Sequence, residues 1–213
     1  MGQNQGRQRP AADRPNRTVA ERMNRSISAF SMSSRTRKRS EQVGTQVNEN
    51  VPPSLSQRQK GIIKETFATV RSAVAEVGVV MFLRLFETHP EVQDIFLPFK
   101  GLTSEEMKHS KQLRNHGLRV MGFVEKCVSR IEQPEKLIAL CLELGLKHVQ
   151  YGAPVDYLPL IGPQFIYAIK PIFDSRWTAE IEEAWLGFFA QAIYYMRQTM
   201  SPVYPTPTRK GSV

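Results

Sequence analysis

The hydrophobic residues between positions 54 and 200 recur every three or four places, and no convincing run alternates apolar and polar residues between turn signals. That spacing places apolar side chains on one face of successive helices, so the sequence predicts an all-α domain. Ser56 and Gln59 have the spacing of a capping box and indicate the start of a first helix. Its buried face is expected to carry Ile62, Ile63, Phe67 and Val70.

Three further features divide the chain before residue 110. The run VGVVMFLRLF at positions 77–86 is apolar nearly throughout, which is typical of a helix buried on most sides. Thr88 and Glu91 have the spacing of a second capping box, and we expect a short helix to run from there toward Phe96. Thr103 and Glu106 repeat the spacing and predict another helix start.

Two later helices each place a histidine on an apolar face. The first face consists of Leu113, His116, Val120, Val124 and Cys127. The second face, in a helix that begins near Pro134 and stops near Gly152, consists of Leu137, Leu140, Cys141, Leu144 and His148. A neutral imidazole is a good iron ligand, and apolar surroundings favour a flat hydrophobic cofactor. A histidine on an apolar face is more often a hydrogen-bonded core residue, so the residues alone leave both interpretations open.

The net charge of +9 is unevenly distributed along the 213 residues. Residues 1–53 contain ten basic and four acidic side chains, residues 54–200 contain seventeen and sixteen, and residues 201–213 contain two basic ones. The first segment has few large apolar residues and is predicted to be a disordered basic extension. Residues 54–200 form the predicted domain, and the proline-containing end, 201–213, is predicted to be a flexible tail.

The composition also limits where the protein acts and what it binds. The chain has no uninterrupted run of eighteen apolar residues, its first thirty residues are hydrophilic, and it has only two cysteines, so we expect a cytoplasmic protein. Cys127 and Cys141 lack metal-ligand spacing and are interpreted as small core residues. No recognition helix accompanies the basic segment, so no nucleic-acid partner is expected. No dedicated catalytic constellation is evident.

The amino terminus offers one candidate modification site. Met1-Gly2 permits N-myristoylation of Gly2, although Gly6 stands where serine or threonine is favoured. One acyl chain gives marginal membrane binding, so the basic residues of 1–53 would supply a second attraction to anionic lipid. A solvated tail is the favoured interpretation of this segment, and peripheral attachment at the inner face of the plasma membrane is the alternative.

Four motifs in order resemble the globin family across residues 54–200. They are MFLRLFETHPEVQDIF, LRNHGLRVM, LGLKHVQYG and EIEEAWLGFFAQAIYYM. The resemblance implies a three-over-three helical fold that holds haem b, with His148 as proximal iron ligand and His116 as distal histidine. It also implies that Phe96 packs on the haem, that Val120 and Leu144 line its pocket, and that Trp185 belongs to the last helix. Gly78 and Gly117 fall where the family's second and fifth helices cross closely.

Within the globins, the chain is most similar to the neuroglobin and globin X group. The spacing between His116 and His148 matches that group, which implies a distal histidine able to bind iron in a six-coordinate haem. Phe82 stands over the distal pocket without a hydroxyl donor. Arg119 could reach a haem propionate, or it could be a solvated cation of the helix surface.

This resemblance implies a redox, electron-transfer or gas-sensing role with O2, NO or CO as ligands and an unidentified electron partner. Two alternatives remain open. One is an oxygen storage or transport globin in which His116 donates a hydrogen bond to bound oxygen. The other is a haem-free globin-fold interaction module.

Overall fold

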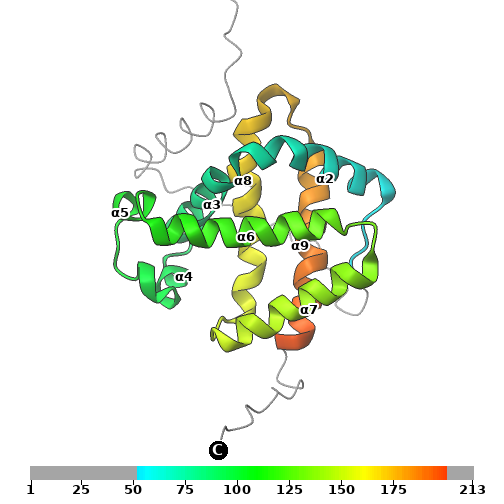
Figure 1. Ribbon diagram of the computed structural model, residues 1–213. Coiled ribbons are helices and arrows are strands. Elements are labelled where there is room, and N and C mark those ends of the chain that lie inside the picture. Colours follow the sequence, from blue (N-terminus) through cyan, green and yellow to red (C-terminus); the bar gives the residue numbers. More distant parts are fainter. Residues whose placement is uncertain (1–51, 201–213) are drawn as a thin grey trace, which may run out of the picture.

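The computed structural model describes residues 52–200, which are helical with no strand (Figure 1). The helices are α2 (Gln57–Val70), α3 (Val74–Thr88), α4 (Pro90–Ile95), α5 (Ser104–Lys108), α6 (Lys111–Ser129), α7 (Pro134–Gln150), α8 (Ile161–Phe173) and α9 (Ala179–Met200). Short 3-10 helices lie at Arg71–Ala73, Leu97–Phe99, Val155–Leu160 and Asp174–Arg176. The predicted all-α class is confirmed. Gly2, nearly all of the basic extension and the predicted tail lie outside the described residues.

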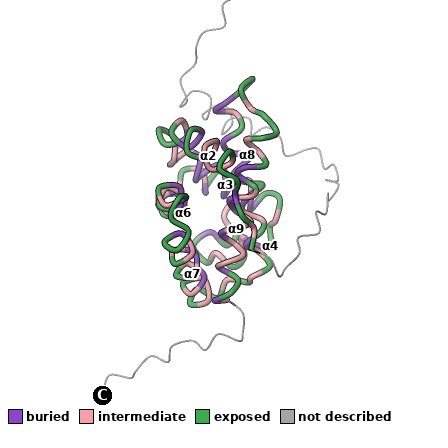
Figure 2. Tube along the Cα trace, turned by 90° about the vertical axis from the view of Figure 1, so that its right-hand side faces the viewer, coloured by how far each residue is buried: buried purple, intermediate pink, exposed green. Residues whose placement is uncertain are grey.

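Two layers of helices enclose the core. Helices α2, α6 and α7 cross in front of α8 and α9 (Figure 1), and the edge-on view places α6 and α7 on the side opposite α3, α8 and α9 (Figure 2). The main contacts across the layers are α3 with α6, α7 with α9 and α2 with α9. This is the predicted three-over-three arrangement, and it brings α6 and α7, the two helices with candidate histidines, into one layer.

Trp185 of α9 lies at the centre of the core and is fully buried. Its ring contacts those of Phe67, Phe165 and Phe188, with centroid distances of 6.2, 4.7 and 5.3 Å. Its Nε1–H donates to the Thr66 hydroxyl at 3.1 Å, so the one polar atom of the ring is satisfied inside the core. The tryptophan therefore holds α2 against α9.

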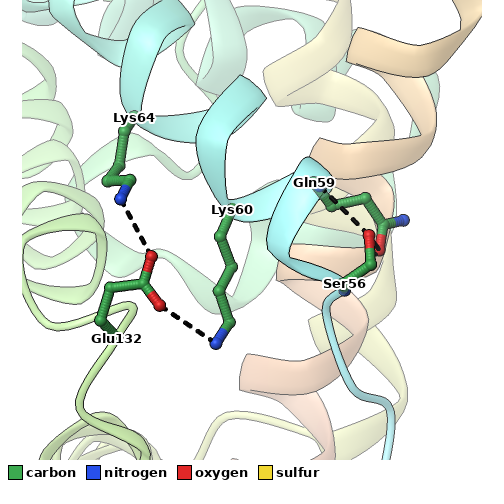
Figure 3. A network of polar contacts seen from close by, with 5 residues as sticks. All are labelled: Ser56, Gln59, Lys60, Lys64 and Glu132. Carbon is green, nitrogen blue, oxygen red and sulfur yellow. Dashed lines mark hydrogen bonds and ion pairs between the residues drawn. The ribbon is translucent and has the colours of Figure 1, made fainter.

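Two of the three predicted capping boxes are present. The Ser56 hydroxyl accepts from the Gln59 backbone N–H at 3.2 Å, and the Gln59 side chain accepts from the Ser56 N–H at 2.9 Å (Figure 3). Thr103 and Glu106 pair in the same reciprocal way.

The third prediction, a box between Thr88 and Glu91, was wrong. Thr88 is the last residue of α3, and its hydroxyl donates to the Arg84 carbonyl at 2.8 Å. His89 occupies the cap position without a side-chain bond, and Pro90 begins α4. Because Leu85 and Phe86 are buried as part of α3, this helix extends through Thr88, and the threonine ends one helix instead of starting the next.

The turn between α6 and α7 is linked to α2 by exposed ion pairs. Glu132 accepts from Lys64 at 2.9 Å and from Lys60 at 3.3 Å (Figure 3). The Lys64 hydrogen bond contributes most to lowering the pKa of Glu132 below its usual range. Exposed ion pairs add little stability, so we assign these pairs only the role of holding the turn before α7 against α2.

The predicted close crossing of Gly78 and Gly117 is confirmed. A Cβ placed on Gly78 would lie 2.7 Å from the Gly117 Cα, and one on Gly117 would lie 2.9 Å from the Gly78 carbonyl carbon. Only glycine permits this approach of α3 to α6, which fixes the position of the helix that carries His116. Gly145 has a similar role on α7, because a Cβ there would collide with the Met196 carbonyl and Thr199 hydroxyl of α9.

The continuous helical stretch Gln57–Thr88 is long and apolar enough to cross a membrane by length and composition, with a mean hydropathy of 1.5 in its most apolar window. However, 67% of that window is buried inside the fold. The hydrophobic residues of this stretch are accounted for by the core that α2 and α3 share with α6, α8 and α9.

Candidate functional site

His116 projects from α6 into a cluster of aromatic rings. Its imidazole meets the rings of Phe82, Phe96 and Phe99 edge-on, with centroid distances of 4.6, 5.4 and 6.4 Å. Phe82 comes from α3, whereas Phe96 and Phe99 come from the corner after α4. The predicted site residues Phe82, Phe96 and His116 are therefore brought together by three separate elements.

Two members of this cluster were not identified from the sequence. Phe86 and Phe99 are both buried, and their ring centroids lie 5.4 and 6.2 Å from that of Phe96. Phe86 lies one helical turn after Phe82 on α3, so the spacing was a usable signal. Phe99 lies in an irregular corner, where hydrophobic periodicity does not predict which side chains point into the core.

The environment of His116 favours its neutral form. Burial lowers the pKa of His116 to about 4, and the electrostatic influence of Arg119 and, to a smaller extent, of His148 acts in the same direction. At neutral pH His116 is therefore uncharged, as a metal ligand must be.

His148 is held in an orientation suited to metal binding. Its Nδ1 lies 2.9 Å from the Leu144 carbonyl oxygen, one turn earlier on α7. A carbonyl only accepts, so Nδ1 carries the proton and the lone pair of the neutral ring is on Nε2. This backbone hydrogen bond is the usual way in which a metal-binding histidine is fixed in one tautomer and orientation.

Three apolar side chains of the predicted site are incompletely covered. Phe96, Val120 and Leu144 are only half-buried, although they pack against the core. On the same two helix faces, Leu113 and Leu137 are buried. The site therefore combines apolar surface that protein atoms do not fully cover with one imidazole from α6 and one from α7, and this fits a flat apolar group.

The donor set agrees with that shape. No three His, Cys, Asp or Glu side chains converge within residues 52–200, so the described residues alone do not form a metal centre. His148 on α7 and His116 on α6 would instead each offer an imidazole nitrogen, the kind of donor that haem iron takes from a protein. The residues present therefore fit haem.

Arg119 is exposed on α6, and its Nη2 lies 3.2 Å from Nδ1 of His116. In this contact the guanidinium is bonded to the histidine itself. The predicted contact of Arg119 with a haem propionate is not tested by it and stays a prediction. The sequence placed Arg119 one turn after His116 but did not indicate a bond between the two side chains.

The remaining candidate residues lie away from the histidine pair. Cys127 and Cys141 are fully buried, and a hydrogen bond with the Cys141 thiol, together with burial, raises the pKa of Cys127. Such thiols are unreactive, in agreement with the expectation of small core residues. His109 pairs with Glu105 on the exposed surface of α5.

A family model described as Globin matches residues 79–196. Cytoglobin-2 of Danio rerio is 30% identical over 146 residues, which cover 68% of this chain and 81% of that protein. Neuroglobin of Danio rerio is 25% identical over 143 residues, which cover 67% of this chain and 90% of that protein. The residues matched by the family model include both helices that carry the candidate histidines.

One solved structure with the same fold is that of a hexacoordinated heme protein from an anhydrobiotic tardigrade, determined at pH 4. Its TM-score is 0.65 at 18% identity, and the alignment covers 68% of this chain and 95% of that chain. At this identity, the likeness concerns the fold.

Proposed function

Because this chain belongs to the globin family and is close to its neuroglobin group, we propose that it binds haem b between α6 and α7 and takes O2, NO or CO as a ligand. His148 is the proximal iron ligand. The observation that carries this proposal is the bond from His148 Nδ1–H to the Leu144 carbonyl at 2.9 Å, which leaves the Nε2 lone pair available.

The other side chains of the site hold the cofactor by apolar contact. Phe96, Val120 and Leu144 are the half-buried residues that a flat ring would cover, and Phe82 supports Phe96 and His116 from α3. Covering this surface removes apolar area from water and excludes water from the iron ligands. Haem supplies reversible gas binding and one-electron redox chemistry.

His116 is the sixth ligand in the absence of gas. Two features support this part of the proposal: burial lowers the pKa of His116 to about 4, which favours the neutral imidazole, and the ring stands among apolar rings rather than beside a polar donor from α3. The structural neighbour is itself described as hexacoordinated. A six-coordinate site suits electron transfer to a partner protein or gas sensing better than oxygen storage, because the distal ligand must leave before gas binds.

The assignment of His148 is tested by haem retention after purification and reconstitution. The variant His148→Ala should lose most of its haem, whereas His109→Ala, which removes an exposed histidine directly after α5, should retain it. The readout is the Soret absorbance per protein, with the circular dichroism of both variants to show that the helices remain folded.

Full haem retention in a folded His148→Ala variant would overturn the proximal assignment. A wild-type protein that takes up no haem would overturn the proposed function as a whole. That result would favour a haem-free interaction module on the same fold.

The basic extension supports a proposal about location. We propose that residues 1–53, with myristate on Gly2, hold the protein at the anionic inner face of the plasma membrane. The support is the concentration of ten basic against four acidic residues in this segment, while the globin domain is nearly neutral.

A further inference from the structure

The hydrogen bond between Arg119 and His116 constrains which ring nitrogen of His116 carries a proton. The guanidinium Nη2 lies 3.2 Å from Nδ1, and both side chains come from α6, three positions apart. An arginine side chain has donors and no acceptor, so Nδ1 must accept. In a neutral imidazole the proton is then on Nε2.

The rest of the His116 environment does not oppose this arrangement. The ring is surrounded by Phe82, Phe96 and Phe99, which offer no strong hydrogen-bond acceptor for an N–H. Arg119 is thus the side chain with a polar contact to this imidazole among residues 52–200. The two histidines therefore differ: His148 has its proton on Nδ1, and His116 has its proton on Nε2.

We propose that Arg119 is a positioning residue that holds neutral His116 in the tautomer with the proton on Nε2. This tautomer can donate a hydrogen bond to a gas molecule but has no Nε2 lone pair for iron. Its consequence for gas binding rests on the proposed haem function. Binding of His116 to the iron then requires Nδ1 to be released from Arg119. Arg119 therefore shifts the equilibrium from the six-coordinate toward the five-coordinate form.

The contact is suited to such a shift because it can be broken readily. Arg119 is exposed, and water competes for its guanidinium once the contact opens. We therefore expect Arg119 to change the ratio of six- to five-coordinate ferrous protein by about fivefold, as one hydrogen bond from an exposed charged donor would.

The tautomer of His116 can be read directly by nitrogen-15 NMR of the full-length chain without haem, at neutral pH. In wild type, the coupling pattern should show the proton on Nε2. In Arg119→Met, which keeps an unbranched apolar side chain and removes the guanidinium donors, the Nδ1–H tautomer should become substantially populated. The control is Arg114→Met, which removes another exposed arginine of α6, one that pairs with Glu76 of α3. This variant should match wild type.

A wild-type chain with the proton on Nδ1, or an Arg119→Met variant with the wild-type tautomer, would overturn the proposal. With haem bound, the ferrous spectrum of Arg119→Met should show about fivefold more of the six-coordinate form relative to the five-coordinate form. A chain that binds no haem would refute the proposed function. The NMR comparison would still decide the role of Arg119.

Discussion

Two histidines with similar positions on helix faces have opposite hydrogen-bond arrangements. His148 donates from Nδ1 to a carbonyl, whereas His116 accepts at Nδ1 from a guanidinium. Helical spacing was enough to predict that both rings face inward. The tautomers could not be predicted, because they depend on the rotamers of Arg119 and of the rings themselves. At this scale the sequence identifies the two candidate ligands, and the contacts give their rings different hydrogen-bond partners.

The depressed pKa of His116 predicts a pH-dependent stability. In the folded haem-free protein this pKa is about 4, against an ordinary value of 6.5, so the unfolded chain binds more protons between these values. The stabilising contribution is complete above about pH 6.5 and is lost as the pH falls toward 4. Between pH 6.5 and 4, the free energy of unfolding of wild type should therefore fall by about 3 kcal/mol more than that of His116→Leu.

Urea unfolding of haem-free wild type and His116→Leu at several pH values measures this difference. Parallel pH profiles for the two proteins would contradict the burial of a neutral imidazole at position 116.

The helices and their starts could largely be predicted from short-range patterns. The boxes at Ser56 and Thr103 are local, because each is completed within three residues. The signal at Thr88 failed because burial of the neighbouring apolar residues extends α3 through it, and that burial depends on other helices. The close approach of Gly145 to α9 was not predicted either, since nothing local distinguishes a packing glycine from a flexible one.

Two glycines on α6 provide a matched test of the helix crossing. Gly117→Ala would place a Cβ about 2.9 Å from the backbone of Gly78, so α3 and α6 must separate. We expect the free energy of unfolding to fall by about 1–3 kcal/mol, and haem affinity to fall with it, because His116 is the adjacent residue. Chemical denaturation and haem transfer to apomyoglobin measure the two effects.

Gly122→Ala is the control on the same helix, because nothing lies within 4 Å of its Cβ position. It should be neutral or stabilise the protein by up to about 1 kcal/mol through helix propensity. Equal stability of Gly117→Ala and Gly122→Ala would show that the crossing tolerates a larger separation than the structure indicates.

At the scale of the whole molecule, a nearly neutral helical domain follows a strongly basic extension. The all-α class and the helix layers could be predicted because the globin motifs occur in order, with suitable spacing, across residues 54–200. The role of residues 1–53 follows from charge and the Gly2 motif alone, and this segment lies outside the described residues.

Vesicle sedimentation tests the proposed membrane attachment with full-length protein. Protein coexpressed with an N-myristoyltransferase should bind phosphatidylserine-containing vesicles better than neutral phosphatidylcholine vesicles, and salt should weaken the binding. Replacing Arg35, Arg37, Lys38 and Arg39 by glutamine should reduce binding by up to about a thousandfold, because each of these four cations contributes about 1 kcal/mol near an anionic surface.

Gly2→Ala prevents acylation and should reduce binding to both kinds of vesicle. If the glutamine variant binds as well as wild type, or if wild type binds neither kind of vesicle, the proposed location is wrong.

The visible absorption spectrum of the reduced protein, recorded for wild type and for His116→Leu, tests the account most directly. We predict that wild type shows the sharp, split bands of iron ligated by two histidines, with His148 on one side and His116 on the other. His116→Leu should convert these bands into the single broad band of a five-coordinate haem. A wild-type spectrum that is already five-coordinate and unchanged by the substitution would contradict the proposed role of His116.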